Sequence, residues 1–219
     1  MPTESNGPLR RPKTSLTIAP VTTWNRLDAP WRHAMRAAIE AYLDDSAPIG
    51  AVVFDSNDRA ISIGRNDFER DRLAHAELQA LKGVPANANR EALSLYSTME
   101  PCPMCTGAIR MMQLRSLHFA AKDPAAGSTE LLSATAFMKR FACDVVGPSD
   151  AGLEFANVAL MLEHRTRNGH RRWRDEWSSY LPEAVAVGEK LAADRRFTHW
   201  QRHAIAVDAI FDEVCSHIE

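Results

Sequence analysis

The sequence predicts an α/β protein in which helices flank a mixed five-stranded sheet. Short apolar runs of strand length alternate with amphipathic segments of helix length, and only a turn separates the first two runs. A hairpin followed by alternating helices and strands combines antiparallel and parallel pairs in one sheet. The 219 residues suffice for one sizeable core and an accessory segment.

The first half of the chain is predicted to form a helix, a hairpin and a second helix. Residues 31–45 carry apolar side chains at steps of four, which is the pattern of an amphipathic helix. Two apolar runs at residues 50–54 and 60–64 lie on either side of the polar segment 55–58, and this arrangement indicates a hairpin. Residues 74–81 are predicted to form the next helix.

The elements after residue 92 are predicted to alternate between strand and helix. One helix begins just after Cys102, because Pro103 fits the first helical turn, where its missing N–H costs nothing. The other elements are strands at residues 93–97, 117–121 and 144–146 and helices at residues 129–141 and 152–165.

Three parts are predicted along the chain. Residues 1–22 contain prolines and lack apolar periodicity, so we expect a flexible leader. Residues 23–168 form the main domain, and residues 169–219 form a helical extension with apolar residues spaced helically around Pro182 and a last helix at residues 199–218. We expect the extension to pack on the core or across a subunit interface, with substrate gating as the alternative.

The composition is that of an ordinary globular protein, with 45% hydrophobic and 25% charged residues and a formal net charge of −2. This charge does not indicate general nucleic-acid binding, although a local basic patch remains compatible with it. No apolar run is long enough to span a bilayer, and no signal-peptide core is present. Four cysteines do not suggest a disulfide framework, so a cytoplasmic location without membrane partners is expected.

Two short motifs supply ligands for a zinc ion. His75 and Glu77 lie in a His-Ala-Glu motif, and Cys102 and Cys105 lie in a Pro-Cys-Pro-Met-Cys motif. One histidine and two cysteines leave the fourth position to water, which distinguishes a catalytic zinc from a structural one. The helix predicted after Cys102 favours this assignment, because helix N-termini stabilise thiolates.

Other interpretations of the cysteine pair are a redox centre and a structural zinc knuckle. A redox pair usually opens the first helix of a thioredoxin-like βαβ unit, and the order of elements here is different. A structural site would need Cys143 or Cys215 as fourth ligand, and both lie far along the sequence. The catalytic zinc is therefore the favoured interpretation.

The residues around both motifs resemble the cytidine deaminase superfamily. The resemblance is carried by Ala-His-Ala-Glu at residues 74–77 and by Thr-Met-Glu-Pro-Cys-Pro-Met-Cys-Thr-Gly-Ala-Ile at residues 98–109, and it extends over residues 31–166. It is strongest to the branch of bacterial tRNA adenosine deaminases, guanine deaminases and yeast-type cytosine deaminases. It implies a three-layer α/β/α cytidine deaminase-like fold, one Zn²⁺ per subunit and, commonly, a homodimer.

The resemblance also implies a reaction and the residues that perform it. The reaction is hydrolytic deamination of an aminated heterocycle, with Glu77 as the proton carrier. By resemblance, Asn66 hydrogen-bonds the substrate ring, the backbone N–H of Ala76 meets the ring, and Asp123 shapes the substrate end of the pocket. Asn66 has an alternative as a turn residue, and Asp123 has one as a turn or helix-capping residue.

Two substrate classes remain open. A free nucleobase or nucleoside, purine-type such as guanine or adenine, is favoured over adenosine in tRNA. Relatives commonly have Asp-Pro-Thr-Ala before the histidine, whereas Arg72 and Leu73 replace Pro-Thr here and change a pocket wall. Five arginines and a tryptophan at residues 164–174 would suit a phosphate backbone, but two acidic residues follow them at once. A binding protein without turnover is disfavoured, because every ligand and the glutamate are present.

Overall fold

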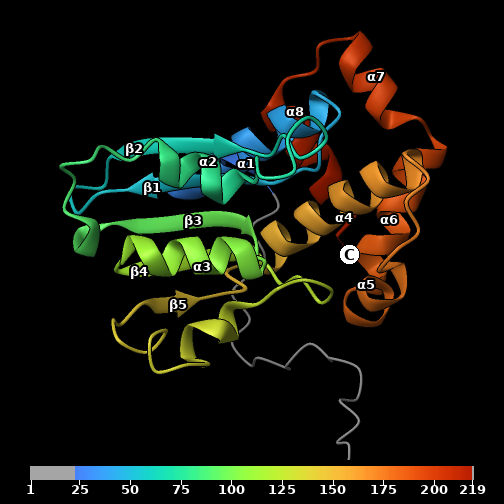
Figure 1. The fold of residues 1–219 in the computed structure, drawn as a ribbon. Helices are drawn as coiled ribbons and strands as arrows, with labels where there is room; N and C mark the ends of the chain where they lie inside the picture. Colours follow the sequence, from blue (N-terminus) through green and yellow to red (C-terminus); the bar gives the residue numbers. More distant parts are fainter. Residues whose placement is uncertain (1–22, 219) are drawn as a thin grey trace, which may run out of the picture.

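Five strands form one mixed sheet in the order β2-β1-β3-β4-β5 (Figure 1). The computed structural model describes residues 23–218, so the leader predicted at residues 1–22 lies outside the described residues. The strands are β1 (Gly50–Phe54), β2 (Ala60–Arg65), β3 (Ser94–Met99), β4 (Ser116–Ala121) and β5 (Asp144–Val146).

The pairing of the strands confirms the mixed sheet. Strand β1 is antiparallel to both β2 and β3, and the β1–β2 pair is the predicted hairpin. Strands β3, β4 and β5 run parallel to one another. The carboxyl end of β3 therefore lies beside the carboxyl end of β4, and the segment that carries Cys102 leaves the sheet at this edge.

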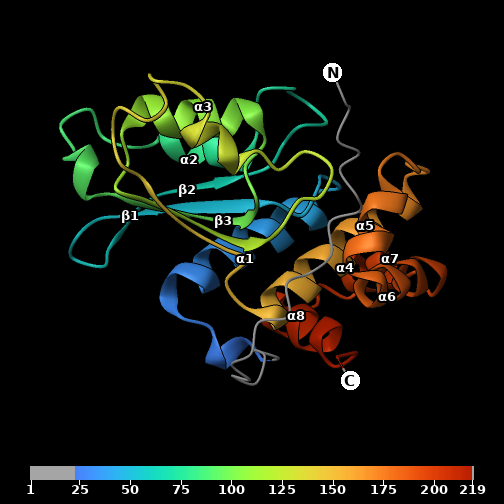
Figure 2. The ribbon, with the colours of Figure 1, turned by 90° about the horizontal axis from the view of Figure 1, so that it is seen from below.

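Helices cover both faces of the sheet, which gives three layers (Figure 2). Helices α2 (Ala76–Lys82) and α3 (Pro103–Met112), which follow the two motifs, lie on one face. Helices α1 (Ala29–Leu43) and α4 (Ala151–Arg167) lie on the other. Three short 3₁₀ helices complete this part of the chain at Trp24–Arg26, Arg90–Ala92 and Thr129–Ser133.

The C-terminal extension packs on α1 and α4. It consists of α5 (Arg174–Tyr180), α6 (Pro182–Ala193), α7 (Arg196–Arg202) and α8 (Val207–Cys215). Its buried Trp177 and Trp200 belong to the same apolar cluster as Met35 of α1 and Leu160 of α4. Among the described residues, no helix has the length and apolar character needed to cross a membrane.

Two helix predictions are wrong. Residues 129–141 form only the 3₁₀ helix at Thr129–Ser133 followed by turns, since the segment is largely exposed and no apolar face stabilises a longer helix. Residues 199–218 form two helices, because Ala204 adopts a left-handed conformation with φ of 48°. The backbone N–H of Ile205 then bonds to the carbonyl of Trp200, 3.0 Å away, and the chain turns into α8.

Gly64 allows α2 to lie directly against β2. A Cβ atom at this position would collide with the carbonyl oxygen of Ala76 and the backbone nitrogen of Ala80. Because these contacts are with backbone, they cannot be relieved by a side-chain rotation. The absence of a side chain at Gly64 thus sets the position of the helix that follows His75.

We expect Gly64→Ala to lower the free energy of unfolding by about 1–3 kcal/mol, because the added methyl group must displace α2. Chemical denaturation with guanidinium measures this change. Gly107→Ala is the matched control, since a Cβ there meets no atom within 4 Å and alanine favours helix by up to about 1 kcal/mol. Equal stability of Gly64→Ala and the wild type would contradict the close approach of α2.

Candidate zinc site

The three predicted zinc ligands lie at the N-termini of two helices. His75 is the N-cap of α2, and Cys102 is the N-cap of α3, where Pro103 occupies the first helical turn. Both N-caps have an extended backbone and no side-chain capping bond, so their side chains are free to face a common point. Cys105 joins them from the first turn of α3 and is buried.

The spacing of the ligand atoms fits a tetrahedral zinc ion. The Sγ atoms of Cys102 and Cys105 lie 3.7 and 3.6 Å from Nδ1 of His75, and the three ligand atoms lie within 4.8 Å of one another. Tetrahedral zinc with its usual bond lengths to sulfur and nitrogen requires a separation of about 3.6 Å between those atoms. The structure thus brings together a set of residues that can hold zinc with one open position.

The two thiols differ in their affinity for protons. The Cys105 thiol and the His75 ring donate hydrogen bonds to the sulfur of Cys102, and they lower the pKa of Cys102 to about 4. The same bond to Cys102, together with burial and the nearby Glu77 carboxylate, raises the pKa of Cys105. A metal ion would therefore find one thiolate already formed and would displace a proton from the second.

Glu77 is buried beside the ligand set, with 3% of its surface exposed. Its Oε1 accepts a hydrogen bond from Oγ of Ser97 at 3.0 Å, and its Oε2 lies 3.4 Å from Sγ of Cys105. Burial raises the pKa of Glu77 above its ordinary value. Ser97 lies inside β3, and no local sequence pattern shows which serine of this strand faces the glutamate.

The loop between β2 and α2 provides a further contact that the sequence did not reveal. Phe68 meets the ring of His75 edge-on, with 5.5 Å between ring centroids, and the guanidinium of Arg72 lies 4.4 Å above the Phe68 ring. Arg72 is otherwise exposed, and neighbouring Leu73 has 58% of its surface exposed. Arg72 and Leu73, which depart from the family pattern, therefore both lie on the surface, and Arg72 covers Phe68.

Asn66 is linked to His75 through the backbone of its neighbours, and its side chain bonds to Ser46. The backbone N–H of Asp67 donates to the carbonyl of Ala74 at 2.8 Å, which closes the loop and brings Asn66 next to His75. The Asn66 side chain is buried, and its Nδ2 donates to Oγ of Ser46 at 3.0 Å. Its role in substrate binding stays a prediction.

The other two predicted substrate contacts also lie near this edge. Ala76 is the first residue of α2, and backbone N–H groups in a first helical turn have no acceptor within the helix. Asp123 follows β4, and its Oδ1 accepts backbone hydrogen bonds from Ala125 and Ala126 at 3.0 and 3.1 Å. These bonds are typical of a turn residue, which is one of the roles predicted for Asp123. Burial raises the pKa of its carboxyl group.

Glu100 ties two loops of the site together. Its buried carboxylate accepts hydrogen bonds from Nζ of Lys122 at 3.0 Å and from Oγ1 of Thr129 at 2.6 Å. Glu100 immediately precedes the Pro101–Cys102 segment, whereas Lys122 and Thr129 flank the loop that contains Asp123. Glu100 therefore holds the loop after β4 against the segment that carries the zinc ligands.

Comparison with known proteins identifies relatives of this site. The profile of the cytidine and deoxycytidylate deaminase zinc-binding region matches residues 26–121. The tRNA-specific adenosine deaminase of Agrobacterium fabrum is 37% identical over 122 residues, which cover 54% of this chain and 79% of that protein.

Two further likenesses concern a longer protein and a solved structure. The tRNA(Ile)-lysidine synthase of Deinococcus deserti is 37% identical over 107 residues, which cover 47% of this chain but only 20% of that protein. This chain therefore spans a fifth of the synthase. A solved protein in complex with 2,6-diaminopurine has a TM-score of 0.51 and 24% identity, covering 64% of this chain and 82% of that chain, which shows likeness of fold.

We expect Cys102→Ala to abolish stoichiometric zinc binding, because it removes the thiolate from the ligand set and leaves two protein ligands. Metal analysis of the purified variant measures the loss. Cys143→Ala is the matched control, since Cys143 is a free cysteine outside the site. Zinc retained at one per chain in Cys102→Ala would contradict this ligand set.

Proposed function

The chain belongs to the zinc-dependent deaminase family of the cytidine and deoxycytidylate deaminases, and we propose that it hydrolytically removes an exocyclic amine from an aromatic heterocycle. The observation that carries this proposal is the position of Glu77. A buried carboxyl group with one oxygen held by Ser97 and the other facing Cys105 is aimed at the zinc position. A structural zinc site has no use for such a group.

Glu77 is suited to carry protons between the reactants. Zinc held by His75, Cys102 and Cys105 would lower the pKa of a water molecule to about 7 and so supply a nucleophile at neutral pH. Glu77 accepts a proton from the water and delivers it to the ring nitrogen beside the attacked carbon. Glu77 then carries the second proton to the amine, which leaves as ammonia while the ring carbon keeps the oxygen.

We favour a free nucleobase or nucleoside, purine-type such as guanine or adenine, as the substrate. The loop beside His75 carries three acidic and two basic side chains at residues 67–72. Both of its arginines are already engaged, since Arg70 pairs with Asp67 at 2.7 Å and Arg72 lies on Phe68. A polyanion gains little from such a rim. The buried Asn66 side chain has its Nδ2 bonded to Ser46, so its carboxamide oxygen can accept one hydrogen bond from a single heterocycle.

Adenosine in tRNA is the second candidate substrate, and two observations favour it. The Agrobacterium fabrum relative is a tRNA-specific adenosine deaminase. In addition, a cavity of about 520 Å³ after α4 is lined by Arg165, Arg171, Arg172 and Arg174. Acidic residues line the same cavity, however, and Arg174 is already paired with Glu189 at 2.6 Å, which weakens its attraction for phosphate.

We also propose that the protein is a cytoplasmic homodimer. Met111 near the end of α3 has 65% of its surface exposed, whereas Leu114 just after the helix is buried. Met111 is thus available to a partner subunit, whereas Leu114 belongs to the core.

We expect Glu77→Gln to lower kcat by at least about 100-fold, because glutamine cannot relay protons, while zinc stays at one per chain. Ammonia release and metal analysis on the same preparation measure both quantities. Cys143→Ala again serves as the control and is expected to retain both activity and zinc. Full activity of Glu77→Gln would contradict the proposed reaction, whereas loss of zinc would indicate a structural role.

The substrate is expected to be found among free bases and nucleosides. The panel contains guanine, adenine, cytosine, their nucleosides and a tRNA anticodon stem-loop, with ammonia release as the readout and Glu77→Gln as the blank. Turnover of a free base or nucleoside supports the favoured substrate, because such a molecule needs no phosphate contacts from the loop at residues 67–72. Turnover of the stem-loop alone would make tRNA the substrate.

A further inference from the structure

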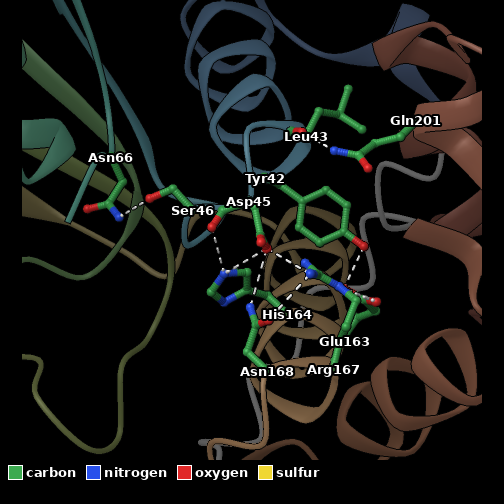
Figure 3. A network of polar contacts seen from close by, with 10 residues as sticks. All are labelled: Tyr42, Leu43, Asp45, Ser46, Asn66, Glu163, His164, Arg167, Asn168 and Gln201. Carbon is green, nitrogen blue, oxygen red and sulfur yellow. Dashed lines mark hydrogen bonds and ion pairs between the residues drawn. The ribbon is translucent and has the colours of Figure 1, made fainter. Parts of the chain in front are cut away.

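Arg167 at the end of α4 connects the C-terminal extension to the turn after α1 (Figure 3). The centre of its guanidinium lies 3.5 Å from the ring centroid of Phe197, a buried residue of α7. Its Nε donates to Glu163 at 3.1 Å, and its Nη1 donates to Oδ1 of Asp45 at 2.7 Å. The guanidinium is therefore fixed by the extension on one face and by two carboxylates at its edge.

The turn that receives this contact is short and strained. Asp45 has a φ of 62°, in the left-handed region, and Asn168 lies 3.4 Å from the same carboxylate oxygen. A left-handed aspartate persists where surrounding contacts hold it. The extension provides a further tether, because Nε2 of Gln201 donates to the carbonyl of Leu43 at 2.6 Å.

The residue after Asp45 is the hydrogen-bond partner of Asn66. Ser46 is buried, its backbone N–H donates to the carbonyl of Ala41 at 2.9 Å, and its Oγ accepts from Nδ2 of Asn66 at 3.0 Å. Figure 3 shows the carboxamide oxygen of Asn66 pointing away from Ser46. Among the described residues this oxygen has no hydrogen-bond donor, so it is available to a ligand.

We propose that the C-terminal extension positions the substrate-binding Asn66, and that Arg167 is the positioning residue that transmits this effect through Asp45 and Ser46. The proposal rests on the proposed function, in which Asn66 contacts the substrate ring. It assigns the extension a role in substrate affinity: Phe197 fixes Arg167, Arg167 fixes Asp45, and the adjacent Ser46 orients the carboxamide. The chemistry at Glu77 lies outside this chain of contacts.

The kinetic test is a double-mutant cycle between Arg167→Lys and Ser46→Ala in the zinc-loaded protein. Lysine keeps the charge but cannot bond Glu163 and Asp45 together in the arginine geometry. Each single variant is expected to raise KM by about 3- to 10-fold, the effect of one hydrogen bond, with kcat within about twofold. In the Ser46→Ala background, Arg167→Lys is expected to raise KM no further, because the route to Asn66 is already broken.

Asp45→Asn is the milder variant in case Arg167→Lys does not fold, since asparagine tolerates the left-handed conformation. Asp45→Asn is expected to raise KM, as Arg167→Lys does. Arg196→Lys is the matched control: Arg196 precedes Phe197 in α7 and pairs with Glu213, but it contacts neither Asp45 nor Arg167. Its KM is expected to equal that of the wild type, and additive effects in the cycle would overturn the proposal.

A second readout does not depend on activity. In ¹⁵N-labelled protein, the side-chain amide signals of Asn66 are identified by their loss in Asn66→Asp. These signals are expected to shift in Arg167→Lys and Asp45→Asn and to stay in place in Arg196→Lys. Unmoved signals in Arg167→Lys would overturn the proposal. If the wild type deaminates no compound of the panel, the proposed function fails, and the amide signals alone decide whether Arg167 positions Asn66.

Discussion

The site depends on two helices that begin at the same point in space. His75 and Cys102 cap α2 and α3, so the free backbone N–H groups of both helices surround the position that a metal would take. The positive ends of the helices favour thiolate ligands and an attacking anion alike. Any movement of α2 relative to α3 would separate the histidine from the cysteines, and the close packing of α2 on Gly64 opposes it.

The side chains around this point divide between two tasks. Ser97 and Glu77 bond to each other beside the zinc ligands and serve proton transfer in the proposed reaction, whereas Glu100 and Ser46 bond to the neighbouring loops. Each loop is tied by a buried polar group rather than by apolar packing. Such bonds define direction as well as distance, which suits the proposed orientation of a flat heterocycle.

The sequence predicts the sheet and the metal ligands well, because both depend on local spacing. Short segments of sequence suffice to predict the alternation of strands and helices and the positions of His75 and Cys102. The helix predicted at residues 129–141 is wrong for a physical reason. A helix of good helix-forming residues stays short when no apolar surface packs against it. The contacts of Ser97 with Glu77 and of Ser46 with Asn66 each join residues 20 positions apart, which no local pattern contains.

Helix α4 is buried along most of its length. Residues 152–164 are buried without interruption, because the sheet covers one side of the helix and the extension covers the other. A helix enclosed on all sides cannot be assigned to one part of the protein or to the other. Removing residues 169–219 would therefore place a row of leucine, valine and methionine side chains of α4 in water.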